Sequence, residues 1–170
     1  IEHNGLTLNG VGNGTKIEDI YVFERADDAI EFFGGTVNVT NLLAVNPDDD
    51  MFDFTQGYCG TLKNCYGVWE RDYTSTEADP RGIEADGNMD GLYPDHLRQS
   101  DFIVENMTIV NNAANTTDNV DRMQDVIKVR RGAKATIKNA LVKGTGGTID
   151  LIDMKAVSYT HLTLPTKRIV

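Results

Sequence analysis

Acidic residues recur at a fixed spacing in the first third of the chain. Three pairs lie 22 residues apart: Asp27 and Asp49, Asp28 and Asp50, and Glu31 and Asp53. Glu84 follows Ile83 as Glu31 follows Ile30, so Glu84 extends the series of acidic residues formed by Glu31 and Asp53. If the repeat stacks as parallel strands, these carboxylates lie about 5 Å apart and raise one another's pKa. The pattern predicts a cation site, an acid and base pair, or a solvated acidic face.

These alternatives assign different roles to the acidic residues. A hard cation such as Ca²⁺ takes six to eight oxygen ligands, and we expect Asp28 and Asp50 among them. Two carboxylates on an exposed groove can instead cleave a glycosidic bond, and Asp53 and Glu84 are the candidates. Glu31 lies in the same column and is a candidate ligand contact.

Arg81 is the basic residue in phase with the acidic repeat. It precedes Ile83 by two positions, as Asp28 precedes Ile30, so it aligns with Asp28 and Asp50. The guanidinium is a candidate base or substrate clamp in an enzyme. Its simpler role is that of an ion-pair partner.

The loop Asp86-Gly-Asn-Met-Asp-Gly91 matches the first half of an EF-hand calcium loop. Asp86, Asn88 and Asp90 are the candidate ligands. The twelfth position is Leu97, where a bidentate Glu is expected, so the motif is incomplete. An Asx-rich turn is the alternative.

Aromatic and cysteine residues offer two further candidate features. Tyr58 and Trp69 fall near predicted turns, where aromatic rings can stack on sugars; burial in a core is the alternative. Cys59 and Cys65 are the two cysteines. They either form a disulfide in an exported protein or are free thiols.

A repeat of short strands must position these residues. A seven-residue pattern with Asn or Asp at its third position begins at Ile17, Val39, Leu62, Val104 and Ile137. A second apolar alternation follows the first four copies, with Ile30, Phe52, Ile83 and Ile127 in phase. Two short strands per unit of about 22 residues cannot bury a core alone, but stacked units can. The first residues of the seven-residue pattern therefore predict one buried apolar column, and the aligned residues of the second alternation predict another.

The third position of the first pattern predicts a polar ladder at a turn. Its members are Asp19, Asn41, Asn64, Asn106 and Asn139. Asn tolerates turn dihedral angles, and its amide can bond to the rungs above and below. The sequence thus predicts an all-β fold, a right-handed parallel β-helix of about five rungs.

Composition excludes several function classes. The 170 residues include 26 acidic and 16 basic residues, giving a net charge of −10. Nucleic-acid binding needs a basic face, so nucleic acid is not an expected partner. No apolar run approaches the roughly 20 residues of a membrane span.

Four segments in order resemble bacterial secreted or surface parallel β-helix proteins of the pectin-lyase-like superfamily. They are Leu6–Glu18, Asp27–Asn38, Asp49–Gly57 and Arg81–Asp86. The resemblance implies a secreted or cell-surface location. In β-helix polysaccharide lyases, Ca²⁺ neutralises a uronate carboxylate and Arg or Lys takes the proton, and by analogy Arg81 beside the acidic column could act so.

Residues 1–156 are predicted to be a fragment of such a β-helix, with an insertion at about 70–101. Residues 157–170 break the pattern and resemble a translated sequencing adapter, so we expect a non-native tail. The predicted function is binding or display at a carbohydrate or cell-envelope glycan, with Ca²⁺ as a candidate stabiliser. The alternative is a lyase or glycoside hydrolase acting on an acidic polysaccharide.

Overall fold

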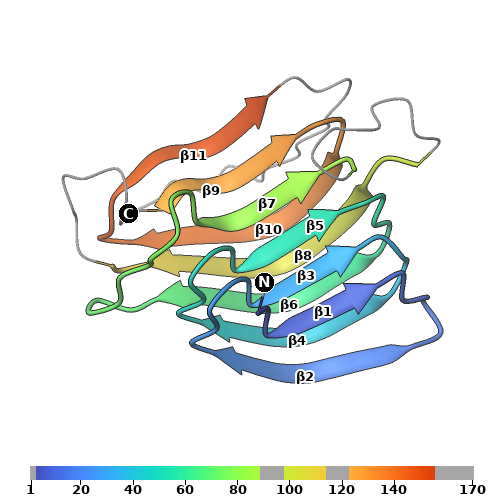
Figure 1. Ribbon diagram of the computed structural model, residues 1–170, viewed down its shortest axis with the longest axis horizontal. Helices are drawn as coiled ribbons and strands as arrows, with labels where there is room; N and C mark the ends of the chain where they lie inside the picture. Colours follow the sequence, from blue (N-terminus) through green and yellow to red (C-terminus); the bar gives the residue numbers. More distant parts are fainter. Residues whose placement is uncertain (1–2, 89–97, 114–122, 156–170) are drawn as a thin grey trace.

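The computed structural model describes residues 3–88, 98–113 and 123–155, and within these residues every regular element is a strand. Figure 1 shows them stacked in two layers. Their bounds are β1 Leu6–Asn9, β2 Lys16–Phe23, β3 Ile30–Phe33, β4 Asn38–Val45, β5 Phe52–Thr55, β6 Thr61–Trp69, β7 Arg81–Asp86, β8 Asp101–Asn111, β9 Met123–Arg130, β10 Lys134–Gly144 and β11 Thr148–Lys155.

Odd-numbered and even-numbered strands form separate parallel sheets. One sheet has the order β1-β3-β5-β7-β9-β11, and the other has the order β10-β8-β6-β4-β2. Each turn of the chain therefore adds one strand to each sheet (Figure 1). This is the predicted right-handed parallel β-helix, and the fold class is confirmed.

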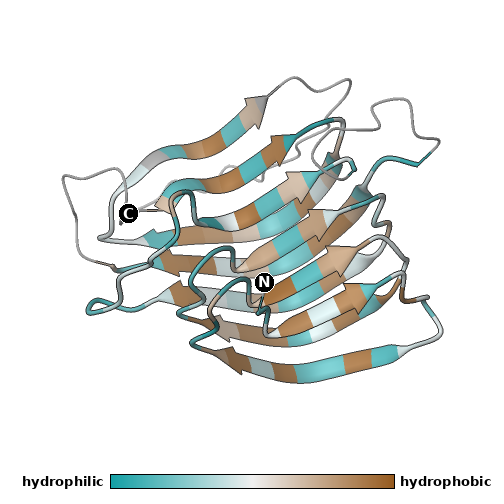
Figure 2. Cartoon of the chain, viewed as in Figure 1, coloured by the Kyte–Doolittle hydropathy of each residue, from teal (hydrophilic) through white to brown (hydrophobic). Residues whose placement is uncertain are grey.

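The two predicted apolar columns form the core between the sheets. Val39 pairs in register with Leu62, and Leu62 pairs with Val104; all three are fully buried. Phe52, Ile83 and Ile127 form the matching column on the other sheet. Brown and teal residues alternate along these strands in Figure 2, which is the period of two that sends one side chain inward and the next outward.

Stacked aromatic rings fill one part of this core. Phe54 lies 5.1 Å from Phe32 and 4.0 Å from Phe102, measured between ring centroids, with nearly parallel planes. Tyr58 packs against the same rings and donates its hydroxyl to the Val37 carbonyl at 2.7 Å. Because Phe54 aligns with Phe32 one rung away, the rung spacing itself sets this stack.

A chain of side-chain hydrogen bonds runs along the even-numbered sheet. Its Asp and Asn members have φ between 54° and 59°, in the left-handed region, and each bends its strand. Each Asn amide donates to the oxygen of the preceding member at 2.8–3.2 Å. The members are Asp19, Asn41, Asn64, Asn106 and Asn139. They lie at bends within strands rather than in turns between them.

The structure bears on several further sequence expectations. Tyr58 and Trp69 are fully buried, and the Trp69 indole donates to the Pro47 carbonyl, so neither is a sugar platform. Of the two alternatives left open for Cys59 and Cys65, the structure has free thiols. The described part of the predicted insertion 70–101 includes β7, which is a regular member of its sheet.

Candidate functional site

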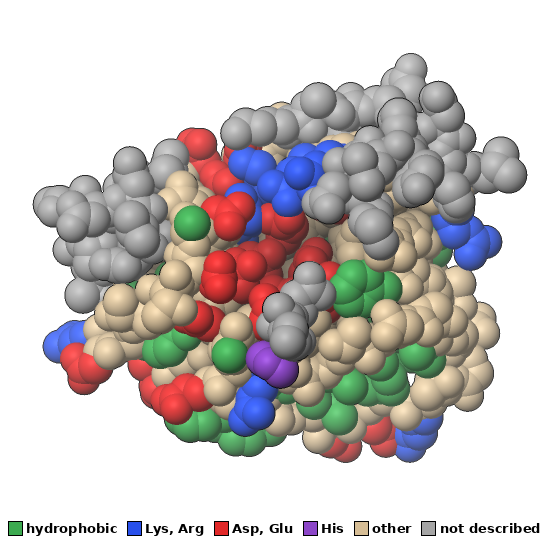
Figure 3. All heavy atoms as spheres, in the orientation of Figure 1, with side chains coloured by type: hydrophobic (Ala, Val, Ile, Leu, Met, Phe, Trp, Pro, Cys, Tyr) green, Lys and Arg blue, Asp and Glu red, His purple; other side chains and the backbone are tan. Residues whose placement is uncertain are grey.

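The candidate site is a hollow on the outer face of the odd-numbered sheet. Glu31, Asp53 and Glu84 are register partners on β3, β5 and β7, and their side chains point away from the core. Figure 3 shows acidic side chains gathered at the centre of this face, with basic side chains beside them. The hollow has a volume of about 490 Å³ and is lined by Glu31, Phe33, Asp49, Asp53, Thr55, Gln56, Asp79, Arg81, Glu84, Asp86 and Arg130.

A second row of charged residues lies at the start of these strands, with Asp28 and Asp50 just before β3 and β5 and Arg81 as the first residue of β7. The Asp50 carbonyl accepts from the Ala29 N–H at 2.9 Å, and the Arg81 carbonyl accepts from the Met51 N–H at 3.0 Å. These bonds align Asp28, Asp50 and Arg81 along the sheet, as the spacing predicted. All three are buried rather than exposed.

Carboxylates hold Arg81 on several sides. Its guanidinium pairs with Glu84 and with Asp79, the latter at 2.9 Å. Its Nε lies 3.6 Å from Asp125 Oδ2. Burial alone would lower the pKa of Arg81, but the charges of Asp50 and Glu84 outweigh it and raise that pKa. These ion pairs hold the guanidinium in its protonated form, and the role of Arg81 as a base or a substrate clamp stays a prediction.

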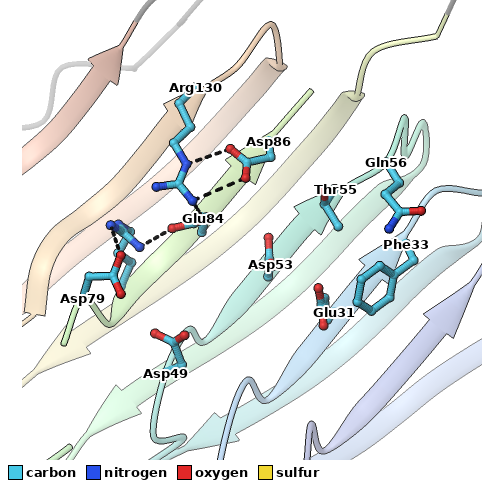
Figure 4. A pocket seen from close by; sticks show the side chains of 11 residues that line it. Glu31, Phe33, Asp49, Asp53, Thr55, Gln56, Asp79, Glu84, Asp86 and Arg130 are labelled. Carbon is cyan, nitrogen blue, oxygen red and sulfur yellow. Dashed lines mark hydrogen bonds and ion pairs between the residues drawn. The ribbon is translucent and has the colours of Figure 1, made fainter. Parts of the chain in front are cut away.

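Arg130 and Arg131 compensate the acidic side chains at the end of β7. Arg130 pairs with Glu84 and with Asp86 Oδ1, the latter at 2.7 Å, as drawn in Figure 4. Arg131 pairs with Asp86 Oδ2 at 2.6 Å. Both oxygens of Asp86 are thus engaged by guanidinium groups, and its role as a calcium ligand stays a prediction.

The rest of the half-matched calcium loop is described only in part. The Asn88 side chain is buried and donates to Gln99 Oε1 at 3.1 Å. Asp90 lies outside the described residues.

Carboxylates gather closely in and just beside the other half of the hollow. Oxygens of Asp28, Glu31 and Asp53 lie within 4.8 Å of one another, and so do oxygens of Asp27, Asp28 and Asp49. Asp28 belongs to both groups. Two oxygens bound to one Ca²⁺ at about 2.3–2.6 Å are at most about 5.2 Å apart, so either group fits around one ion.

Three carboxyl oxygens beside these groups have no hydrogen-bond donor. They are Asp49 Oδ1, Asp50 Oδ1 and Asp53 Oδ1, all shielded from solvent. Only 3% of Asp50 is exposed. A buried charged oxygen without a partner is costly, so this part of the hollow is suited to a bound cation.

The carboxyl groups in this half have strongly perturbed pKa values. Burial, and then the charge of Asp49, raises the pKa of Asp28 to about 9. Burial, and then the charge of Asp79, raises the pKa of Asp49 to about 7. Burial and neighbouring carboxylates also raise the pKa values of Asp50 and Asp53 well above the ordinary range. Without a cation, some of these carboxyl groups are therefore protonated, which reduces the repulsion among them.

Six of the eleven lining residues were not among the predicted site residues: Phe33, Asp49, Thr55, Gln56, Asp79 and Arg130. Ile127 was predicted to align with Ile83 of β7, and extending that register by three residues would have placed Arg130 beside Asp86. Asp49 was already aligned with Asp27 by the spacing of 22. Asp79 lies in a loop and Phe33 ends its strand, so neither carried a periodic signal.

Comparisons with known proteins point to one family. A family model described as a pectate-lyase-like beta helix domain matches residues 1–166. Neither the search of curated proteins nor the search of solved structures found a match. Among the described residues, no helix is long and apolar enough to cross a membrane.

Proposed function

This chain belongs to the family of pectate-lyase-like β-helix domains, and from that premise we propose that it binds an acidic polysaccharide through a divalent cation, with Ca²⁺ as the favoured ion. Asp28, Glu31 and Asp53 would hold the ion, and Asp49 and Asp50 flank it. The bound cation supplies the positive charge that draws a uronate carboxylate into an otherwise repulsive hollow.

One observation carries this proposal. Asp49 Oδ1, Asp50 Oδ1 and Asp53 Oδ1 are buried without hydrogen-bond donors beside carboxylates whose oxygens lie within 4.8 Å of one another. In the other half of the hollow, Arg81 and Arg130 already satisfy Glu84 and Asp86. The contrast supports a cation site in the half formed by β3, β5 and the loops before them.

Binding is favoured over elimination by the state of Arg81. A lyase needs a base near the sugar carbon that loses its proton, and the base must be neutral for part of the time. Arg81 is 5% exposed and is held by Glu84 and Asp79, with its pKa raised. The ion pairs make it a structural cation that orients the neighbouring carboxylates.

Glycoside hydrolysis is the second candidate, and it rests on Asp49. This residue lines the hollow, and its pKa is raised to about 7, which suits a general acid near neutral pH. Asp53 is the nearby carboxylate that would act as base or nucleophile. Release of reducing ends from an acidic polysaccharide, abolished by Asp49→Asn, would favour this candidate over binding alone.

The setting we propose is the outside of a bacterial cell. Membership in a carbohydrate-related family supports it, as does a cation site made of oxygen ligands, because modules with weak calcium affinity operate where calcium is abundant. The role is then binding or display at a polysaccharide or cell-envelope glycan.

The proposal is tested by titrating soluble oligogalacturonate into the protein with Ca²⁺ or with a chelator. We expect binding with Ca²⁺, loss of binding with chelator, and at least tenfold weaker binding for Asp53→Asn, about 1.4 kcal/mol. Asp101→Asn is the control, because it removes an exposed carboxylate from the other sheet. Equal binding with and without Ca²⁺ would refute the proposal.

A further inference from the structure

Three Asn-Gly pairs lie close together near the start of the chain, at Asn4-Gly5, Asn9-Gly10 and Asn13-Gly14. In this dipeptide the backbone nitrogen of glycine can attack the side-chain amide of asparagine, because glycine has no Cβ to shield that nitrogen. The attack needs a glycine N–H that is not held in a hydrogen bond and a backbone that is free to rotate. Since the three pairs share one chemistry, their surroundings decide which of them reacts.

The fold holds the first pair through both its side chain and its backbone. The Gly5 N–H donates to the Asp28 carbonyl at 2.8 Å. The Asn4 side chain donates to Glu31, and its carbonyl oxygen accepts from the Asp28 N–H at 3.2 Å. A Cβ on Gly5 would lie 2.3 Å from the Val22 side chain, so the backbone is closely packed as well. Attack by the Gly5 nitrogen would break these contacts.

The second pair lies at the end of strand β1. Asn9 is the last residue of this strand and pairs in register with Phe33, which keeps its backbone extended. The Gly10 N–H donates to the Phe33 carbonyl at 2.9 Å. Asn9 is exposed, but the strand end must separate from β3 before the glycine nitrogen becomes free. Exposure alone therefore does not make this pair reactive.

The third pair lies in a turn of the loop that joins β1 to β2 (Figure 1). The Thr15 N–H closes this turn by donating to the Gly12 carbonyl at 3.0 Å, and all four turn residues are exposed. Within the described part of the chain, the Gly14 N–H has no acceptor and the Asn13 side chain has no partner. The Asn13 N–H donates to Thr36 Oγ1 at 3.1 Å, but this group takes no part in the attack. The turn thus meets both requirements.

We propose that Asn13 is a site of spontaneous deamidation in the folded protein, whereas the fold protects Asn4 and Asn9. The Gly14 N–H loses its proton to hydroxide, and the nitrogen forms a bond to Asn13 Cγ. The Cγ–Nδ2 bond breaks, and the leaving nitrogen takes up a proton from water and departs as ammonia, which regenerates the hydroxide. A succinimide ring remains, and water opens it at either carbonyl to give aspartate or isoaspartate. Nothing is oxidised or reduced.

The product differs from the original protein at one defined place. Each event adds a negative charge to a chain whose net charge is already −10. The isoaspartate form also adds a methylene group to the backbone of the turn, close to the hydrogen bond between Asn13 and Thr36. We expect the modified chain to separate by charge and the hollow to keep its structure, because no residue that lines the hollow belongs to this turn.

The test follows all three sites in the same protein by peptide mass spectrometry and by enzymatic methylation of isoaspartate. The folded protein is incubated in mildly alkaline buffer, and we expect Asn13 to convert at least about tenfold faster than Asn4 or Asn9. In urea the hydrogen bonds of Gly5 and Gly10 are lost, so we expect the three sites to convert at similar rates.

Gly14→Ala tests whether the backbone nitrogen is the nucleophile. A Cβ at this position meets nothing within 4 Å, and φ of Gly14 is not in the left-handed region, so the variant should fold normally. The added methyl group should slow conversion of Asn13 at least about tenfold. Gly12→Ala is the matched control, because it adds a methyl group to the same turn with equal space and leaves the Asn13-Gly14 pair intact. Thermal melts check that both variants are folded.

The outcomes decide between the fold and the local sequence. Conversion confined to Asn13 in the folded state and spread over all three sites in urea would support the proposal. Similar rates at the three sites of the folded protein, or no conversion at Asn13, would overturn it. Conversion that stays confined to Asn13 in urea would assign the preference to local sequence and overturn the protective role of the fold. An unchanged rate in Gly14→Ala would overturn the attack by the backbone nitrogen.

Discussion

Asp53 and Glu84 are register partners on β5 and β7, yet their carboxylates have opposite surroundings. Glu84 is paired with Arg81 and Arg130, whereas Asp53 Oδ1 is buried without a hydrogen-bond donor. The hollow therefore has two halves. On the β7 side arginine side chains neutralise the carboxylates, and on the β5 side carboxyl oxygens have no hydrogen-bond donor. The proposed cation site follows from this division.

The substitution Asp53→Asn should stabilise the protein when divalent cations are removed. The amide is neutral and supplies a donor to neighbouring carboxylates, so we expect a gain of about 1 kcal/mol in the free energy of unfolding. With saturating Ca²⁺ the order should reverse, because only the wild type binds the ion well. Thermal melts in chelator and in Ca²⁺ measure both effects, and a variant less stable than wild type in chelator would contradict the first.

The stability of the metal-free protein should fall as the pH rises from about 4 to about 9. The folded-state pKa values of Asp49, about 7, and Asp28, about 9, lie above their ordinary value of 3.8. The folded protein therefore holds protons that the unfolded chain releases, and this contribution to stability is lost as the pH passes through the folded pKa values. Urea unfolding in chelator across this range tests the sign; stability that rises toward pH 9 would contradict it.

Removal of Arg130 should destabilise the fold strongly. Arg130→Met removes one guanidinium partner from Glu84 and one from Asp86, and both carboxylates are buried. We therefore expect the free energy of unfolding to fall by about 3–5 kcal/mol. Lys63→Ala is the control, since its pair with Glu105 is on the surface and should cost less than about 1 kcal/mol. Chemical denaturation compares the two, and similar small losses would show that the buried pairs contribute little.

The asparagine chain should contribute through both its backbone conformation and its hydrogen bonds. Asn64 has φ of 54° and bonds to Asn41 and Asn106. Asn64→Ala loses both features and should cost about 2 kcal/mol, whereas Asn64→Gly keeps the conformation and should cost less. Equal losses on urea unfolding would assign the whole effect to the hydrogen bonds.

Much of the fold was predictable because it depends on periodic local signals. The spacing of Ile17, Val39 and Leu62 aligned one core column, and the structure pairs these residues in that register. Longer spacings did not disturb the prediction, because the described strands keep the same register from Leu62 to Val104 and from Val104 to Ile137. Parallel stacking converts a sequence period directly into a spatial column, so the register follows from the sequence.

The site was predictable only in part, because burial and pairing depend on loops. The spacing aligned Arg81 with Asp50, but it could not reveal that Asp79 and Asp125 would enclose the guanidinium. Tyr58 and Trp69 looked like turn residues, although their rings point into the core. A periodic pattern predicts whether a side chain on a strand points inward or outward. It does not predict which residues from other segments pair with that side chain or bury it.

The most direct test of the cation site is a calorimetric titration of the protein with Ca²⁺ alone. The wild type should bind the ion with saturable heat and release protons from the carboxyl groups, whose pKa values are raised. The double variant Asp28→Asn/Asp53→Asn should lose this binding, and Asp101→Asn should keep it. An absence of saturable binding in the wild type, or undiminished binding in the double variant, would contradict the account.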